Sequence, residues 1–69
     1  MAYPVALPFV VDAALVEQLR MRMERRFRDL EIAELRHMPR HVLDRMFDAY
    51  MLAFREYDAA LERLYPSHG

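Results

Sequence analysis

One pair of residues has types and a spacing suited to metal chemistry. Glu34 and His37 are three positions apart in the segment Glu-Leu-Arg-His. Residues three apart on a helix lie on the same face. Helical bundles that hold two iron ions take a pair of ligands from one helix with this Glu-x-x-His spacing. A metal-binding, di-iron-like helical bundle is therefore an alternative function for the chain, with Glu34 and His37 as its candidate ligands.

A purely structural interpretation of the same pair is favoured. The two residues lie where a first helix should end, and a histidine there complements the negative end of the helix dipole. A di-iron site would also need carboxylates from a second helix. In that helix, Asp58 is the acidic residue that borders the apolar stripe, and it lies far from the turn. We therefore expect no bound metal and no cofactor.

Other catalytic chemistry lacks suitable residues. The chain has no Cys, Lys or Thr, and its one serine, Ser67, is close to the end of the sequence. A nucleophilic thiol, amine or hydroxyl therefore has no good candidate. Gly69 is the single glycine, so no glycine-rich loop can bind phosphate groups. We expect a protein that is not an enzyme and assign it no catalytic residue.

The charged residues are nearly balanced. Ten arginines and eleven acidic residues give a net charge of −1. A string of arginines occupies positions 20–28, but glutamates and aspartates are interleaved with it. Binding to nucleic acid normally requires a large positive surplus. A small DNA-binding regulator is thus a further alternative, and we expect no nucleic acid partner.

Two long segments have the apolar periodicity of amphipathic helices. Asp12 is a suitable N-cap for a first helix, predicted over residues 12–36. Pro39, a residue preferred in the first turn, should open a second helix over residues 39–65. Apolar residues recur every three or four positions along both segments. The stripes are Leu15, Leu19, Met23, Phe27 and Leu30 in the first, and Leu43, Met46, Phe47, Tyr50, Phe54, Tyr57, Leu61 and Leu64 in the second.

The matched lengths of the two helices predict their arrangement. A short break at Pro39 between helices of equal length favours an all-α, antiparallel two-helix hairpin. The alternative is one long helix kinked at Pro39, because neither Gly nor Asn is present to cap the end of the first helix.

A hairpin of this size should need a partner. A chain of 69 residues buries a small share of its surface, and without cysteine it cannot form disulfides. Apolar residues nevertheless make up 55% of the sequence. We therefore expect two hairpins to form a homodimeric four-helix bundle. Its oligomer core should contain Leu19, Met23, Phe27, Leu30, Phe47, Tyr50, Phe54, Tyr57 and Leu61.

A few apolar residues lie off these stripes and should be exposed. They are Met21, Ile32, Met51 and Leu52. Adaptable apolar side chains on an outer surface are typical of a partner-binding site. The sequence therefore favours a small non-enzymatic protein–protein interaction module that binds itself and another protein. A regulator, chaperone, inhibitor or accessory subunit would each fit.

The ends of the chain have distinct compositions. Residues 1–11 form an apolar arm, which we expect to pack across the open end of the bundle; a detachable arm that binds a partner is the alternative. The arm has no basic segment before it and contains two prolines, unlike a secretory signal, and it is too short to cross a membrane. We expect a disordered tail at 66–69, a cytoplasmic location and no membrane partner.

Overall fold

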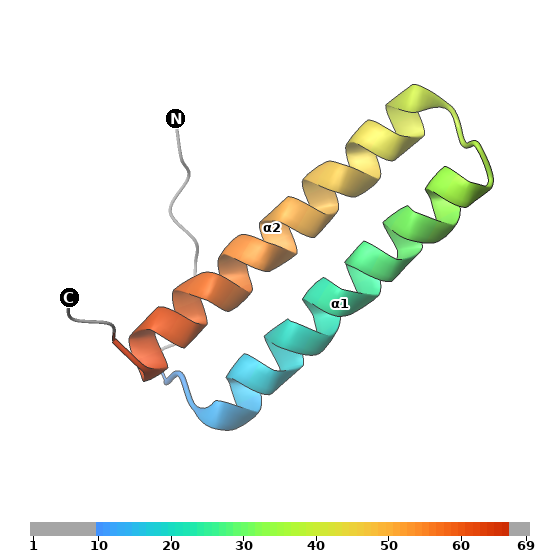
Figure 1. Cartoon of the computed structure of the whole chain (residues 1–69). Helices are drawn as coiled ribbons and strands as arrows, with labels where there is room; N and C mark the ends of the chain where they lie inside the picture. The colour runs from blue at the N-terminus through green and yellow to red at the C-terminus, as the bar shows by residue number, and fades with distance from the viewer. Residues whose placement is uncertain (1–9, 67–69) are drawn as a thin grey trace.

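The chain folds as two antiparallel helices. The computed structural model describes residues 10–66, in which α1 spans Ala13–Leu35 and α2 spans Arg40–Leu64. The helices lie side by side along their whole length (Figure 1). The predicted all-α hairpin is confirmed, and the single kinked helix is wrong. Most of the predicted N-terminal arm and tail, residues 1–9 and 67–69, lies outside the described residues.

The first helix begins at the predicted cap. Asp12 has extended backbone geometry, and its Oδ1 atom accepts a hydrogen bond of 2.8 Å from the backbone N–H of Leu15. Such a side-chain acceptor satisfies one of the backbone donors that the first turn leaves without a partner, and is worth about 1 kcal/mol.

The turn between the helices is closed without glycine. His37 takes a left-handed backbone conformation with φ 53°. Its N–H donates to the carbonyl of Glu34, and the N–H of Met38 donates to the carbonyl of Ala33, both at 3.1 Å. This pair of bonds is the Schellman motif, which usually has glycine at the left-handed position. The motif ends α1 and reverses the chain, and Pro39 then occupies the N-cap position of α2, where its carbonyl accepts from the N–H groups of Val42 and Leu43.

The helices meet along a line of small residues. The buried residues are Val16, Leu19 and Ala33 in α1, and Ala53 and Ala60 in α2. Three of these five are alanines, and no large side chain in the described chain is completely buried. The sequence stripes did not include the alanines, since they were defined by large apolar residues. Most of those larger residues lie beside the line of contact.

A cluster of buried residues lies at the open end of the hairpin, opposite the turn. Val16, Leu19 and Ala60 form a buried cluster there. Partly buried residues pack against this open-end cluster: Val11, Leu15, Tyr57, Leu61 and Leu64. Leu19, Tyr57 and Leu61, which the sequence assigned to an oligomer core, therefore already have apolar neighbours within one chain.

Candidate functional site

Large apolar residues gather on one side of the hairpin, from its middle to the turn. The Phe27 and Tyr50 rings, from different helices, have centroids 5.3 Å apart, and the rings of Tyr50 and Phe54 are 6.4 Å apart. Leu30 of α1 and Leu43 and Phe47 of α2 line one hollow on this side. We call this surface the aromatic face. It consists of Met23, Phe27, Leu30, Leu43, Phe47, Tyr50 and Phe54.

The aromatic face is open to water. Phe27, Phe47 and Phe54 are 46%, 50% and 40% exposed. A single exposed apolar side chain is ordinary, but a contiguous group of half-exposed rings is typical of surfaces through which proteins associate. Six of the seven residues were predicted as oligomer core, and Leu43 belonged to the predicted stripe. The structure brings these six together but leaves them on the surface of the single chain.

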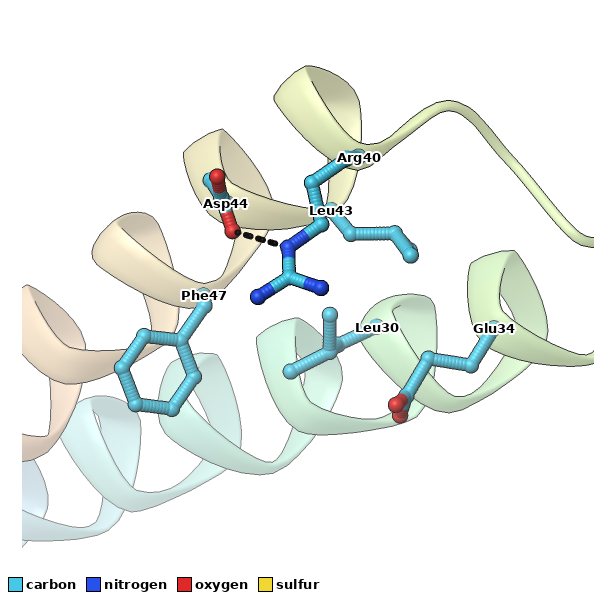
Figure 2. Close-up of a pocket in the computed structure, with 6 residues that line it drawn as sticks. All are labelled: Leu30, Glu34, Arg40, Leu43, Asp44 and Phe47. Carbon is cyan, nitrogen blue, oxygen red and sulfur yellow. Dashed lines mark ion pairs between the residues drawn. The ribbon is translucent and has the colours of Figure 1, made fainter.

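A hollow lies at the end of the aromatic face nearest the turn. It has a volume of about 310 Å³, and Leu30, Leu43 and Phe47 supply its apolar walls (Figure 2). Glu34 lies at one edge, and the guanidinium of Arg40 extends in among the apolar walls, where its Nε forms an ion pair of 3.6 Å with Asp44 Oδ1 (Figure 2). We call this the loop-end hollow. Its apolar walls, with a guanidinium beside them, would suit an aromatic side chain from another molecule.

The four predicted partner-binding residues do not form one surface. Met21, Ile32 and Leu52 are exposed, but Met51 is half-buried, so its expected exposure was wrong. Met51 is four residues after Phe47 and three before Phe54, which places it at the edge of the aromatic face. Leu52, the next residue, points about 100° away from it.

The residues on α1 are also dispersed. Met21 and Ile32 share a stripe of the helix but are about 16 Å apart along its axis. Ile32 borders a separate hollow of about 260 Å³, together with Ala33, Met38 and Met46. These residues could therefore contribute to two or three separate contacts, but not to one compact patch.

Glu34 and His37 are not presented as a pair of helical ligands. The helix ends at Leu35, and His37 lies in the turn with a left-handed backbone. The two residues therefore do not share a helical face, although both are exposed. Within residues 10–66, no group of three or more histidines and carboxylates is placed to hold a metal ion. The geometry that motivated a metal site is absent.

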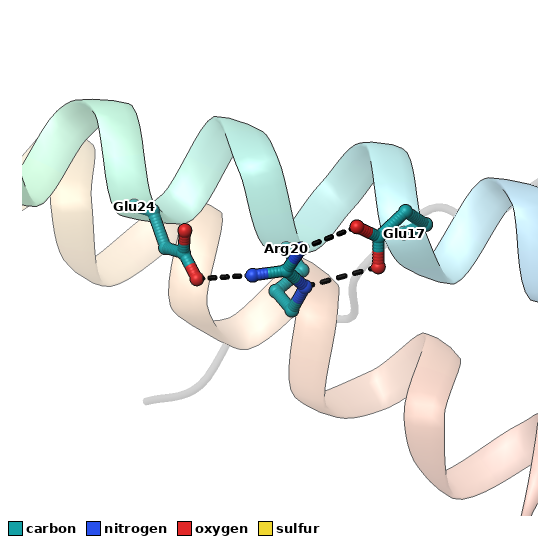
Figure 3. A network of polar contacts seen from close by, with 3 residues as sticks. All are labelled: Glu17, Arg20 and Glu24. Atoms are coloured by element: carbon teal, nitrogen blue, oxygen red, sulfur yellow. Dashed lines mark hydrogen bonds and ion pairs between the residues drawn. The ribbon is translucent and has the colours of Figure 1, made fainter.

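Part of the arginine string is engaged by neighbouring carboxylates. Arg20 lies between Glu17 and Glu24 and pairs with both, and its Nε donates to Glu17 Oε2 at 3.0 Å (Figure 3). The hydrogen bond from Arg20 lowers the pKa of Glu17, and the pKa of Arg20 is raised in return. Arg22 reaches across to Glu56 of α2 at 4.0 Å. These contacts favour a solvated, charge-paired surface over an anion site.

Comparisons with known proteins returned no match among family models, curated proteins or solved structures. In the part of the chain that the structure describes, neither helix is long and apolar enough to cross a membrane. The aromatic face is thus the feature on which a functional argument can rest.

Proposed function

We propose that this chain is a small non-enzymatic protein–protein interaction module that works as an oligomer of helical hairpins. Its simplest form is a homodimer in which two aromatic faces meet and complete a four-helix bundle. The observation that supports this is the contiguous exposure of Phe27, Phe47 and Phe54 in a hairpin that buries no large side chain completely.

The energetics favour covering this face. Full burial of a phenylalanine side chain is worth about 1.5–3 kcal/mol relative to leaving it in water. The three half-exposed phenylalanines retain a large part of that free energy for an association step. A hairpin of two helices, each about 10 Å wide and about 35 Å long, presents one whole side on the order of 700 Å², of which the aromatic face takes up about half. Because a stable interface buries roughly 800 Å² per partner, the dimer would also have to use the rest of this side.

A second protein would be contacted elsewhere. Met21, Ile32 and Leu52 lie outside the aromatic face, and Met51 lies at its edge. We propose that these residues take part in separate contacts with another protein. A cytoplasmic regulator, chaperone, inhibitor or accessory subunit would use the module in this way.

The test of self-association is the subunit number of a matched pair of variants. Native mass spectrometry and sedimentation velocity at micromolar concentrations should give a dimer for the unaltered chain. Phe47→Glu should give a monomer, because it places a charge in the centre of the buried interface. Leu52→Glu is the control, since Leu52 is 58% exposed and is not part of the aromatic face. A folded monomer for the unaltered chain at these concentrations would overturn the proposal.

A further inference from the structure

We infer that the two hairpins pack with their turns at opposite ends, so that Phe54 of each copy enters the loop-end hollow of the other. The inference rests on the proposed self-association and adds the direction of packing and the residue that completes the hollow. In a dimer with two-fold symmetry the contacts are reciprocal. The axis that places Phe54 of one copy in the hollow of the other must therefore also place the second Phe54 in the first hollow.

Along the hairpin, the loop-end hollow lies on one side of the Phe27–Tyr50 contact and the ring of Phe54 lies on the other. Phe27 and Tyr50 pack together at 5.3 Å and therefore mark one level along both helices. On α2 the hollow is lined by Leu43 and Phe47, on the turn side of Tyr50. Phe54 is four residues, or about 6 Å, to the other side of Tyr50.

A two-fold axis at the level of the Phe27–Tyr50 contact brings the Phe54 ring of one copy to the loop-end hollow of the other. If the axis passes at Tyr50, perpendicular to the helices, residues equally far before and after Tyr50 face each other across the interface. Phe54 of the second copy then lies at the level of residue 46 along α2. This level falls between those of Leu43 and Phe47, the apolar walls of the hollow on α2, whereas the side chain of Met46 lines the separate hollow. Phe54 is 40% exposed, so its ring is available to enter.

The opposite direction of packing does not bring Phe54 to the hollow. With the turns at the same end, the loop-end hollows of the two copies would face each other. Phe54 would instead meet the other copy near Met23, which is as far from Phe27 as Phe54 is from Tyr50. Protein interiors are close-packed, and an unfilled hollow forfeits the dispersion contacts of its lining. Filling two hollows with two rings is therefore the better packed arrangement.

Spin-label distances distinguish the two directions. The chain has no cysteine, so Arg36→Cys near the turn and Ala14→Cys near the open end each create one labelling site. Both positions are exposed. With turns at opposite ends, pulsed electron resonance should give about 25–30 Å between the Arg36 labels and about 40 Å between the Ala14 labels. With turns at the same end, both distances should fall to about 10–20 Å.

The outcomes separate this inference from the proposed function. Native mass spectrometry of the labelled samples reports the subunit number directly. A monomer would overturn the proposed self-association and, with it, this inference. A dimer with two short distances would overturn the packing direction alone.

A truncation tests the residue in the hollow. Phe54→Ala should raise the dimer dissociation constant about 100-fold, because two symmetry-related rings are lost from the interface centre. Leu52→Ala, the matched control outside the face, should leave the constant unchanged. If the two variants weaken the dimer equally while both stay helical by circular dichroism, Phe54 does not fill the hollow.

Discussion

The two halves of this hairpin use the same pair of helices differently. At the open end, Val16, Leu19 and Ala60 are buried and partly buried residues surround them. In the half near the turn, Phe27 and Phe47 remain about half exposed. Both halves are rich in apolar residues, so hydrophobicity alone does not explain the difference.

The difference arises from side-chain size. At the open end a valine and a leucine of α1 form a buried cluster with Ala60 of α2, and partly buried residues pack against the three. Nearer the turn, Ala33 and Ala53 occupy buried positions, and the bulky rings lie to one side of them. The open end is therefore covered by contacts within one chain, whereas the aromatic face stays exposed on the single chain and is the surface that we propose a second copy covers.

The largest effect should come from truncating the open-end cluster. Leu19→Ala should lower the free energy of unfolding by about 2–5 kcal/mol, because Leu19 is buried and its removal leaves a cavity. Phe47→Ala should destabilise the chain mainly at concentrations where the dimer forms. Urea denaturation followed by circular dichroism, at two protein concentrations 100-fold apart, measures both.

These two variants test whether the open end and the aromatic face differ in their dependence on the dimer. The loss caused by Leu19→Ala should be similar at the two concentrations, while the loss caused by Phe47→Ala should shrink on dilution. If Phe47→Ala is equally damaging when dilute, Phe47 belongs to the core of the single chain, and the two halves do not differ in the way described.

A smaller effect on stability is expected from placing a larger side chain on the line of contact between the helices. Ala60 is 0% exposed, so Ala60→Leu should cost about 1–3 kcal/mol by forcing the helices apart. Ala14→Leu adds the same atoms at an exposed helical position and should change stability by less than about 0.5 kcal/mol. Thermal unfolding of the two variants makes the comparison. Equal melting temperatures would mean that Ala60 is not tightly packed and that side-chain size does not decide which residues lie between the helices.

The sequence predicted the hairpin well, because helical periodicity and the Pro39 break are strong local signals. Asp12 was predicted as the N-cap from another local signal, a short acidic side chain directly before the first periodic segment. The alanine contact was missed because alanine is a good helix former at any position, buried or exposed, and leaves no distinct stripe. Which apolar residues lie between the helices and which lie beside them depends on the rotation of each helix, and a single helical wheel does not fix that rotation.

The conformation of the turn and the clustering of the aromatic face also could not be predicted from the sequence. His37 adopts a conformation that glycine prefers, so the sequence carried no signal for the cap that ends α1. The residues of the aromatic face were predicted as a group, since they share stripes. Their clustering in one half of the hairpin, and the position of Met51 at the edge, required the packing of both helices.

The turn offers a stabilising change. Left-handed geometry costs an L-residue about 1–2 kcal/mol, so His37→Gly should raise the free energy of unfolding by about 1 kcal/mol. The control is Arg45→Gly in the exposed interior of α2, which should lower it by about 1 kcal/mol. Urea midpoints of the two variants should therefore move in opposite directions. A loss of stability in His37→Gly would indicate that the histidine side chain makes a contact worth more than the backbone strain.

The smallest effect concerns the charged residues of the open half. The hydrogen bond from Arg20 lowers the pKa of Glu17 in the folded chain, so this carboxylate stabilises the fold above the ordinary pKa of a glutamate. That contribution is lost as the pH falls through the lowered pKa. Arg20→Gln should therefore move the pKa of Glu17 upward, as measured by NMR titration of its carboxyl carbon. Because the group is exposed, stability at neutral pH should change little. A large loss of stability in Arg20→Gln would assign the strength of the open half to its ion pairs and not to the Val16–Leu19–Ala60 cluster.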